Sequence, residues 1–513
     1  MINLNKPILV AALLILASAA NAKTEPTAVS QNDLSQLHRD CTDIARANFA
    51  SNVTITLAEP RPSSEFLPSF CQVQGTIHPN IGFEARLPLN EWNGKFFMAG
   101  CGGFCGVLNA DKESQSNAIN YALRKGYAAL ITDGGHQGSS IGDGKWALDN
   151  PQAEQVYAHR VLPLGHAAGH ELIEQMYQSQ PAFSYFSGCS NGGRLAAMAA
   201  QRYPTLFDGI VAGCPVLNLS INGGVFGPWV LQSNTDDQGR TILDHTFAGK
   251  LAMLEANAYA ECDGVDGMVE GVISKPQDCS ITLSAVPVCE QHDDENCLTN
   301  EQRQTVLSWY RGPHNSKGEK LFAGMPPGSE RYWTLWYLGG PDHAGPGTML
   351  GSDYGRYLGY PTDPEGFTAL DFNFDTDVPD LSQQGQLFNA LDPDLSAMHA
   401  ANAKMIMWHG LADPLVLADQ SRDYYEQVVS TMGKQKADDV LRLFLAPGLG
   451  HCWELPAALP DNMDILHALE AWVERGIEPN QIPLAHDKGD QLKGVLNAYP
   501  KEAEYVDGQG NVQ

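Results

Sequence analysis

Three short segments carry residues that together could perform nucleophilic catalysis. The first is the G-x-S-x-G motif Gly188–Gly192, which lies between a predicted strand, Phe183–Ser187, and a predicted helix, Gly192–Tyr203. In that context the serine occupies a tight turn above a sheet, and only glycine tolerates the crowding on either side. Ser190 is therefore the candidate nucleophile, and the backbone N–H of Asn191 is a candidate oxyanion donor. The alternative is an ordinary Gly-Ser turn.

A serine hydroxyl also needs a base and a third group that orients this base. Asp413 follows the predicted strand Lys404–Trp408, and His451 follows the predicted strand Leu441–Leu445. The chain order Ser, Asp, His is that of α/β-hydrolases. Asp413 could instead cap a helix before the proline that follows it. His409 is a competing base, but it precedes the acid, and we expect it to be structural.

Two cysteines adjoin the candidate nucleophile and base. Cys189 directly precedes Ser190, and Cys452 directly follows His451. If the serine and the histidine form a hydrogen bond, their neighbours lie close enough for a disulfide. The sequence therefore predicts a Cys189–Cys452 disulfide that joins the nucleophile to the base.

A glycine-rich loop, Gly100–Gly106, follows the predicted strand Lys95–Ala99. This is the position that normally supplies the second oxyanion donor of such enzymes, and we choose the N–H of Gly103 for that role. The alternative is a flexible surface turn. Cys101 and Cys105 could form a small disulfide that stiffens the loop.

An acidic loop, Cys262–Ile273, carries three carboxylates at spacings of three and four residues between glycines. This pattern suits a hard cation such as calcium, and a solvated acidic turn is the equally weighted alternative. Cys262 and Cys279 bracket the loop, so a disulfide between them would hold it closed. His166 and His170 lie four apart on one predicted helix, but without a third ligand we expect satisfied histidines rather than zinc ligands.

The predicted elements alternate between strands and helices from about residue 70 to 215, and again from Lys404 to Arg475. This rhythm predicts a mostly parallel sheet with helices on both faces, and hence an α/β-hydrolase fold. Between these parts the periodicity weakens and aromatic residues cluster. We expect a signal peptide at 1–22, a catalytic domain in two parts at 23–214 and 397–513, and an inserted lid domain at 215–396.

Charge and composition restrict the possible partners. The chain has 513 residues and a formal net charge of −28, which argues against nucleic acid and anionic membranes. Lys6, the apolar run Pro7–Ala20 and the Ala20–Ala22 (ANA) site are typical of a cleaved signal peptide, with an uncleaved anchor as the alternative. Export to the periplasm or the medium would let disulfides persist. Eleven cysteines leave at least one thiol unpaired.

The Cys-Ser, Asp and His-Cys arrangement resembles the tannase and feruloyl esterase family, which also includes the hydrolase of mono(2-hydroxyethyl) terephthalate. The resemblance extends along most of the chain after residue 22. It is carried by these further segments: Trp92–Phe96 (WNGKF), Thr132–His136 (TDGGH), Gly188–Arg194 (GCSNGGR), Gln201–Pro204 (QRYP) and Phe207–Ile210 (FDGI).

This resemblance implies an α/β-hydrolase with a large lid that holds a structural calcium ion, and no organic cofactor. It implies calcium ligation by the side chains of Asp263, Asp266 and Glu270 and by the carbonyls of Met268 and Val272. Glu270 stands where the family usually has Asp. The disulfides that it implies are Cys41–Cys71, Cys262–Cys279 and Cys289–Cys297, beside Cys189–Cys452; with Cys101–Cys105 they leave Cys214 free.

The function that follows is serine-dependent hydrolysis of a small aromatic ester through an acyl-enzyme, with esters of phenolic acids such as ferulate or gallate as the leading substrates. An alternative is cleavage of mono(2-hydroxyethyl) terephthalate or related monoalkyl phthalates. The resemblance places Arg356, with Tyr360 one turn later, where an arginine holds the free carboxylate of that substrate; a lid salt bridge is the alternative. A binding protein on an inactive hydrolase scaffold is a third hypothesis. The oligomeric state is not predicted.

Overall fold

The computed structural model describes residues 31–113, 116–269, 271–290, 292–452, 463–484 and 493–506. Within these residues the main sheet has nine strands, in the order β1-β2-β3-β5-β4-β6-β7-β8-β9. The strands are β1 Val53–Arg61, β2 Phe70–Ile77, β3 Ile81–Pro88, β4 Lys95–Ala99, β5 Ala128–Thr132, β6 Phe183–Cys189, β7 Gly209–Gly213, β8 Lys404–Gly410 and β9 Leu441–Ala446. The predicted signal peptide lies outside the described residues.

The fifteen α-helices of the described residues are α1 Gln31–Asp43, α2 Asn120–Arg124, α3 Pro151–Gln155, α4 Val161–Tyr177, α5 Asn191–Arg202, α6 Leu219–Ile221, α7 Gly227–Ser233, α8 Leu251–Cys262, α9 Asn300–Arg311, α10 Pro346–Tyr357, α11 Ser382–Phe388, α12 Ser396–Ala400, α13 Asp419–Met432, α14 Lys434–Val440 and α15 Ile465–Arg475. Three π-helical segments also occur, at Val156–Arg160, Asn222–Phe226 and Thr334–Leu338.

The sheet is parallel from β5 through β9, whereas β1, β2, β3 and β5 pair antiparallel. The predicted strands of the parallel part are all present, but neither β1 nor β2 was predicted. Residues Val53–Leu57 of β1 (VTITL) alternate apolar and polar side chains, which is the pattern of a half-buried strand, so the sequence carried a signal there that the prediction did not use.

Two apolar layers cover the sheet, as alternation along β4 shows. Phe96 and Met98 face the core that α4, α5 and α13 cover, and Phe97 and Ala99 face the core that α15 covers. The helical stretch from Pro151 to Tyr177, which carries His166 and His170, consists of α3, a π-helical segment and α4 in succession. The chain after Gln481 forms a small antiparallel sheet, with β10 Gln481–Leu484, β11 Lys493–Asn497 and β12 Glu504–Val506.

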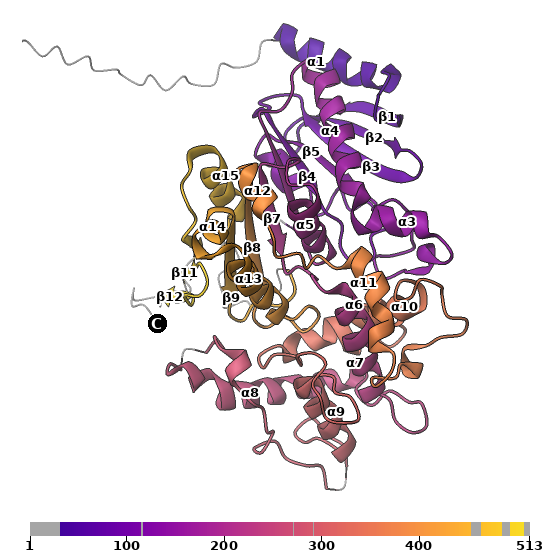
Figure 1. Ribbon diagram of the computed structural model, residues 1–513, viewed down its shortest axis with the longest axis vertical. Helices are drawn as coiled ribbons and strands as arrows, with labels where there is room; N and C mark the ends of the chain where they lie inside the picture. Colours follow the sequence, from indigo (N-terminus) through magenta and orange to yellow (C-terminus); the bar gives the residue numbers. More distant parts are fainter. Residues whose placement is uncertain are drawn as a thin grey trace, which may run out of the picture.

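The chain between β7 and β8 contains helices α6 to α12. Helices α6 to α11 form a separate layer beyond the sheet, whereas α12 lies beside α5 and α14, next to the sheet (Figure 1). The core of this layer is continuous with one face of the sheet, because Trp309, Trp333 and Tyr354 belong to the same apolar cluster as Phe96 and Met98. The insertion is therefore attached by packing as well as by its two chain connections.

The five predicted disulfides are all present: Cys41–Cys71, Cys101–Cys105, Cys189–Cys452, Cys262–Cys279 and Cys289–Cys297. Cys214 is free and buried, as predicted. Among the helices of the described residues, none is both long enough and apolar enough to cross a membrane.

Candidate active site

Ser190 occupies the turn between β6 and α5 in a strained conformation, with φ of 63° and ψ of −122°. A positive φ is unfavourable for a residue with a Cβ, and it persists here because the flanking strand and helix fix the turn. A methyl group at Gly188 would lie 2.5 Å from the carbonyl carbon of Gly192, and one at Gly192 would collide with Asn117. Both glycines of the motif are therefore needed for the close approach of strand and helix.

Asp413 and His451 form a buried pair beyond the carboxyl ends of β8 and β9. Nδ1 of His451 lies 2.6 Å from Oδ2 of Asp413. The other carboxylate oxygen, Oδ1, accepts the N–H groups of Leu415 and Val416, each at 2.9 Å. These contacts fix the imidazole so that its Nε2 is the nitrogen left for chemistry.

Burial alone would raise the pKa of Asp413, because the charged form loses its hydration. The charge of His451 and the hydrogen bonds from His409 and His451 outweigh that effect and hold the pKa below its ordinary value. The carboxylate therefore stays ionised at neutral pH, as is required to stabilise a histidine that takes up a proton.

His409 and Cys214 lie behind Asp413, and the ligand atoms of the three side chains are within 4.8 Å of one another. Nδ1 of His409 lies 2.7 Å from the Ser421 hydroxyl, and Nε2 donates to the carbonyl of Val416 at 2.7 Å. Because both nitrogens are engaged, His409 is available neither as the base nor as a metal ligand. Burial raises the pKa of the Cys214 thiol, so it remains protonated.

The disulfide Cys189–Cys452 joins the nucleophile turn to the loop that carries the histidine, with the two Cα atoms 5.9 Å apart. Ser190 and His451 border one common cavity. The structure therefore brings together Ser190, Asp413 and His451, which come from positions up to 261 residues apart in the sequence.

The glycine-rich loop is rigidly held beside Ser190. Gly103 has φ of +57°, and a methyl group there would collide with the carbonyl of Ile141. The same carbonyl accepts the N–H of Phe104 at 2.7 Å, and the Cys101–Cys105 disulfide spans the loop. His136, from the TDGGH segment, lies with Nε2 2.6 Å from the Phe104 carbonyl. These contacts describe a preorganised loop rather than a flexible turn.

Asn117 is a site residue that sequence reasoning missed. Its amide nitrogen donates to the Cys189 carbonyl at 3.1 Å, and its amide oxygen accepts the Cys189 N–H at 2.9 Å. This pair of bonds fixes the peptide directly before Ser190. The segment around Asn117 carries no recognised motif, so its role depends on a contact with a residue 72 positions away.

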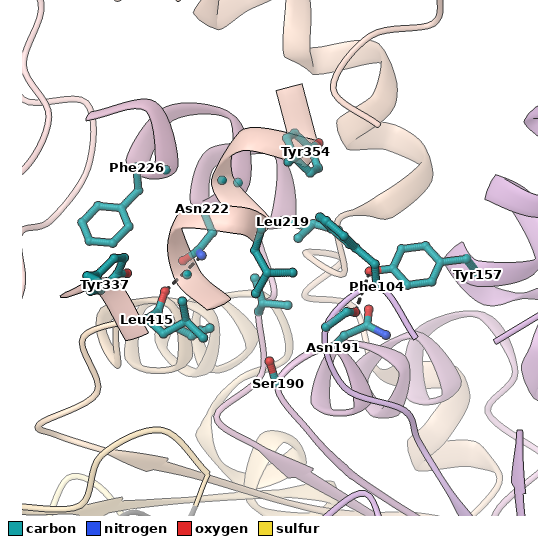
Figure 2. Close-up of a pocket in the computed structure, with 18 residues that line it drawn as sticks. Phe104, Tyr157, Ser190, Asn191, Leu219, Asn222, Phe226, Tyr337, Tyr354 and Leu415 are labelled. Atoms are coloured by element: carbon teal, nitrogen blue, oxygen red, sulfur yellow. Dashed lines mark hydrogen bonds between the residues drawn. The ribbon is translucent and has the colours of Figure 1, made fainter. Parts of the chain in front are cut away.

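Two cavities meet at Ser190. Gly103, Ser190, Leu350 and Leu415 border both of them. The apolar cavity, shown in Figure 2, is further lined by Phe104, Tyr157, Asn191, Val216, Leu219, Asn222, Phe226, Tyr337, Tyr354, Val416 and glycines 223, 227, 347 and 351. The second, which we name the histidine cavity, is further lined by Gly102, Asn109, Lys112, Asn117, Ile141, Leu335, Trp336, His451 and Cys452.

The insertion supplies much of the wall of both cavities. In Figure 2, Leu219, Asn222, Phe226, Tyr337 and Tyr354 lie on the far side of the apolar cavity from Ser190. The insertion also holds the catalytic loops directly. The hydroxyl of Tyr337 donates to the Pro414 carbonyl at 3.0 Å, and that of Tyr332 donates to the Gly448 carbonyl at 2.7 Å. The placement of Asp413 and His451 thus depends in part on the insertion.

The family model described as tannase and feruloyl esterase matches residues 66–513. The chain belongs to this family. An uncharacterized esterase of Xanthomonas campestris pv. campestris is 32% identical over 92% of this chain and 89% of its own length. The mono(2-hydroxyethyl) terephthalate hydrolase of Piscinibacter sakaiensis is 31% identical over 82% of this chain and 79% of its own.

Solved structures agree on the fold. The crystal structure of feruloyl esterase B from Aspergillus oryzae has a TM-score of 0.76, at 24% identity, over 91% of this chain and 96% of that one. The tannin acyl hydrolase of Aspergillus niger has a TM-score of 0.71, at 20% identity, over 94% and 95%. The predicted α/β-hydrolase fold is confirmed. As a member of the tannase and feruloyl esterase family, the chain is a carboxylic-ester hydrolase.

The acidic loop of this family member follows α8. Asp263 is buried, and its Oδ2 accepts the Gly271 N–H at 3.0 Å. Oδ1 of Asp266 accepts the Met268 N–H at 3.0 Å, while its Oδ2 is buried and has no hydrogen-bond partner among the described residues. Val272 is buried and Met268 is exposed. Glu270, the fifth predicted ligand, lies outside the described residues. A buried carboxylate oxygen without a donor fits a bound cation.

Arg356 and Tyr360 are not at the candidate site. Nε of Arg356 donates to the Phe367 carbonyl at 3.2 Å, and the Tyr360 ring packs edge-on against the Phe367 ring at 5.7 Å between centroids. Neither residue is among the described residues that line either cavity. Arg356 forms no salt bridge among the described contacts, because its Nε turns to the Phe367 carbonyl. The carboxylate clamp, which would need a bound substrate, stays a prediction.

Proposed function

We propose that the chain is an exported serine esterase that hydrolyses esters of phenolic acids through an acyl-enzyme. The observation that carries this proposal is the position of Ser190, which stands between the apolar cavity and the histidine cavity. One cavity accommodates a flat aromatic acyl group, and the other lies on the side where a histidine can protonate a leaving alcohol.

In this proposal the Nε2 of His451 accepts the proton of Ser190 as the serine oxygen attacks the ester carbonyl. Asp413 holds the imidazole by its 2.6 Å contact with Nδ1. The N–H groups of Gly103 and Asn191 receive the negative charge of the tetrahedral intermediate, each contributing about 3 kcal/mol. His451 then gives the proton to the leaving alcohol, and water cleaves the acyl-enzyme by the same steps in reverse.

The walls of the two cavities favour an uncharged phenolic acyl group. Three tyrosines, Tyr157, Tyr337 and Tyr354, line the apolar cavity beside leucine and phenylalanine side chains. None of the described residues that line this cavity is a lysine or an arginine. A free carboxylate, such as that of a terephthalate monoester, would be buried there without a counter-charge, which is costly. Ferulate or gallate esters are therefore favoured over the terephthalate monoester.

The histidine cavity has a more polar wall, with Asn109, Lys112 and Asn117 beside His451. Because the protonated base must face the leaving group, this cavity takes the alcohol in our proposal. Its polar side chains suit a hydroxylated alcohol such as a sugar or a polyol.

Hydrolysis rates on methyl ferulate, methyl gallate and mono(2-hydroxyethyl) terephthalate test the substrate assignment, with purified Ser190→Ala as the control. We expect the highest kcat/KM on one of the two phenolic esters and loss of all turnover in the variant. A preference for the terephthalate monoester would contradict the assignment of an uncharged acyl group. Unchanged turnover by Ser190→Ala would contradict the serine mechanism, and substrate binding without turnover by the wild type would indicate an inactive scaffold.

We also propose that the acidic loop binds a structural calcium ion. The side chains of Asp263, Asp266 and Glu270 and the carbonyls of Met268 and Val272 would hold it, and the buried Oδ2 of Asp266 supports this assignment. The ion would neutralise the loop and keep it folded against α8. Removal of calcium with a chelator should lower Tm, and calcium should restore it; Asp266→Asn should show no response to either treatment.

Export and cleavage after Ala22 complete the proposal. The five disulfides of the described residues are supporting evidence, because disulfides persist in oxidising compartments. The mass of the protein recovered from the periplasm or medium should correspond to a chain that begins at Lys23. A full-length chain retained in the membrane fraction would contradict export by a cleaved signal peptide.

A further inference from the structure

Arg194, in the first turns of α5, is a buried cation whose side chain has no carboxylate partner among the described residues. Its exposed fraction is 0%. The guanidinium donates to the side-chain oxygen of Asn191 at 2.8 Å and to the carbonyls of Ala158, Phe388 and Tyr157 at 2.8, 3.1 and 3.1 Å. All four acceptors are neutral. A charge buried in this way is expensive, so its retention calls for a functional reason.

One of the hydrogen bonds of Arg194 reaches Asn191, the first of the two proposed oxyanion donors. Because Oδ1 of Asn191 accepts from Arg194, the amide nitrogen of Asn191 points the other way. It donates to the Cys101 carbonyl at 3.1 Å and contacts Cys105 Sγ at 3.3 Å. Arg194 thereby fixes the side chain that joins the start of α5 to the glycine-rich loop.

A second set of contacts leads from Arg194 through Tyr157 to Gly103, the other proposed oxyanion donor. The guanidinium lies over the ring of Tyr157, 4.9 Å from its centroid, and the Tyr157 hydroxyl donates to the Gly103 carbonyl at 3.1 Å. Gly103 and Asn191 are the two residues whose N–H groups receive the oxyanion in the proposed function. Asn191 therefore contacts the guanidinium directly, and Gly103 is reached through one residue, Tyr157.

We propose that Arg194 is a positioning residue that sets the distance between the two oxyanion donors, and that its unpaired charge favours the negatively charged intermediate. The inference rests on the proposed function. The guanidinium donates at 2.8 Å to the side chain of Asn191, whose own backbone N–H receives the oxyanion in the proposed function. In a buried site of low dielectric, a cation this near attracts the developing oxyanion, whereas the neutral ester gains little. The effect should therefore appear in kcat rather than in KM.

Two substitutions separate the geometry from the charge. Arg194→Lys keeps the cation but cannot reach four acceptors with a single ammonium group, whereas Arg194→Gln removes the charge. We expect kcat on the best phenolic ester to fall about 10-fold for the lysine variant and about 100-fold for the glutamine variant, with KM changed less than about 3-fold. Affinity for an aryl trifluoromethyl ketone, which forms an anionic adduct with a serine, should fall in proportion to kcat.

Arg442→Met is the matched control, because Arg442 is also buried but pairs with Glu478 at 3.0 Å at the start of β9. It should lower Tm without changing kcat or affinity for the ketone. If the Arg194 variants do not fold, Tyr157→Phe tests the second set of contacts alone, since it removes only the hydroxyl bond to Gly103; we expect kcat to fall about 5-fold.

Equal losses for Arg194→Lys and Arg194→Gln, or effects confined to KM, would overturn the proposal. So would an unchanged kcat in Tyr157→Phe. Ser190→Ala, measured alongside, keeps the two proposals distinguishable. If that variant is inactive and the Arg194 variants retain wild-type kcat, only the role of Arg194 fails. If Ser190→Ala is active, the serine mechanism itself fails.

Discussion

Asp413 in the sheet region and Glu330 in the insertion are both completely buried carboxylates, yet their surroundings shift the pKa in opposite directions. Asp413 accepts two backbone N–H groups and contacts two histidines, and its pKa is held below the ordinary value. Glu330 accepts from the Tyr310 hydroxyl at 2.5 Å and from the Gly328 N–H at 3.1 Å, both through Oε1. Its Oε2 has no hydrogen-bond partner in the described part of the chain.

Burial consequently raises the pKa of Glu330 to about 7, despite the hydrogen bonds from Tyr310 and Gly328. The difference in pKa follows from the number of hydrogen-bond donors around each carboxylate. Around Asp413 both carboxylate oxygens accept hydrogen bonds, which keeps an anion beside His451, as the proposed mechanism requires. Around Glu330 one carboxylate oxygen has no hydrogen-bond donor among the described residues, so the Glu330 carboxylate binds a proton more readily. The comparison can be tested with the same chemical change in both places, a carboxylate replaced by an amide of equal size.

The largest effect is expected for Asp413→Asn. An amide cannot stabilise the protonated imidazole and can favour the wrong tautomer of His451, so kcat at pH 7 should fall about 10⁴-fold. Steady-state hydrolysis of the best phenolic ester measures this. Glu330→Gln is the matched control and should stay within about 2-fold of wild type. Similar losses in the two variants would remove the distinction between the two sites.

An intermediate effect is expected for removal of the disulfide that joins the nucleophile turn to the histidine loop. The double variant Cys189→Ala, Cys452→Ala opens a 263-residue loop, and its free energy of unfolding should fall by about 2–5 kcal/mol. Its kcat should fall about 10-fold, because Ser190 and His451 lose their covalent spacing. The control is Cys289→Ala, Cys297→Ala in the insertion, which opens only 8 residues. Unchanged kcat in the first variant would show that packing alone aligns the serine and the histidine.

The smallest effect is a change in the pH dependence of stability in Glu330→Gln. The folded pKa of about 7 lies above the ordinary value of 4.5, so the folded state binds the proton more tightly than the unfolded state. Wild-type stability should therefore fall as pH rises from about 4.5 through 7, by roughly 3 kcal/mol. Denaturant unfolding at several pH values should show this slope reduced in Glu330→Gln. Asp413 contributes with the opposite sign, since its stabilisation is lost only in strong acid. Parallel pH profiles for wild type and Glu330→Gln would contradict the assignment.

The sequence predicted the parallel half of the fold and the three residues that the structure brings together at the candidate site, because both depend on local patterns. A buried strand, a tight turn and a helix are adjacent in the chain around Ser190, so the motif itself specifies the strained turn. Asp413 and His451 each follow a strand of the same parallel sheet, and parallel strands bring their carboxyl ends to one edge. The cysteines next to Ser190 and His451 then predicted their own pairing.

Other features could not be derived in this way. Asn117 acts on Cys189 from a loop without a motif. Arg194 contacts Asn191 directly and Gly103 through Tyr157, and no sequence spacing reveals these contacts. Arg356 and Tyr360 were assigned by resemblance alone, and the insertion turns them toward Phe367. In the insertion the weak periodicity gave no basis for predicting which side chains face a cavity.

By itself, then, the sequence pointed to the candidate nucleophile, its candidate partners and the Cys189–Cys452 disulfide, because these follow from local geometry and from the covalent neighbours of reactive residues. Three other disulfides came from the family resemblance. Only the tertiary structure decided the shape and polarity of the two cavities at Ser190, and the burial of Arg194 and Glu330 without a full set of partners. The physical reason is that the burial of a side chain depends on residues that come together from distant segments, such as 103–104, 219–227 and 337–354. The distance between these segments along the chain does not show that they are in contact. Burial in turn sets the pKa of a buried group and the strength of its electrostatic interactions.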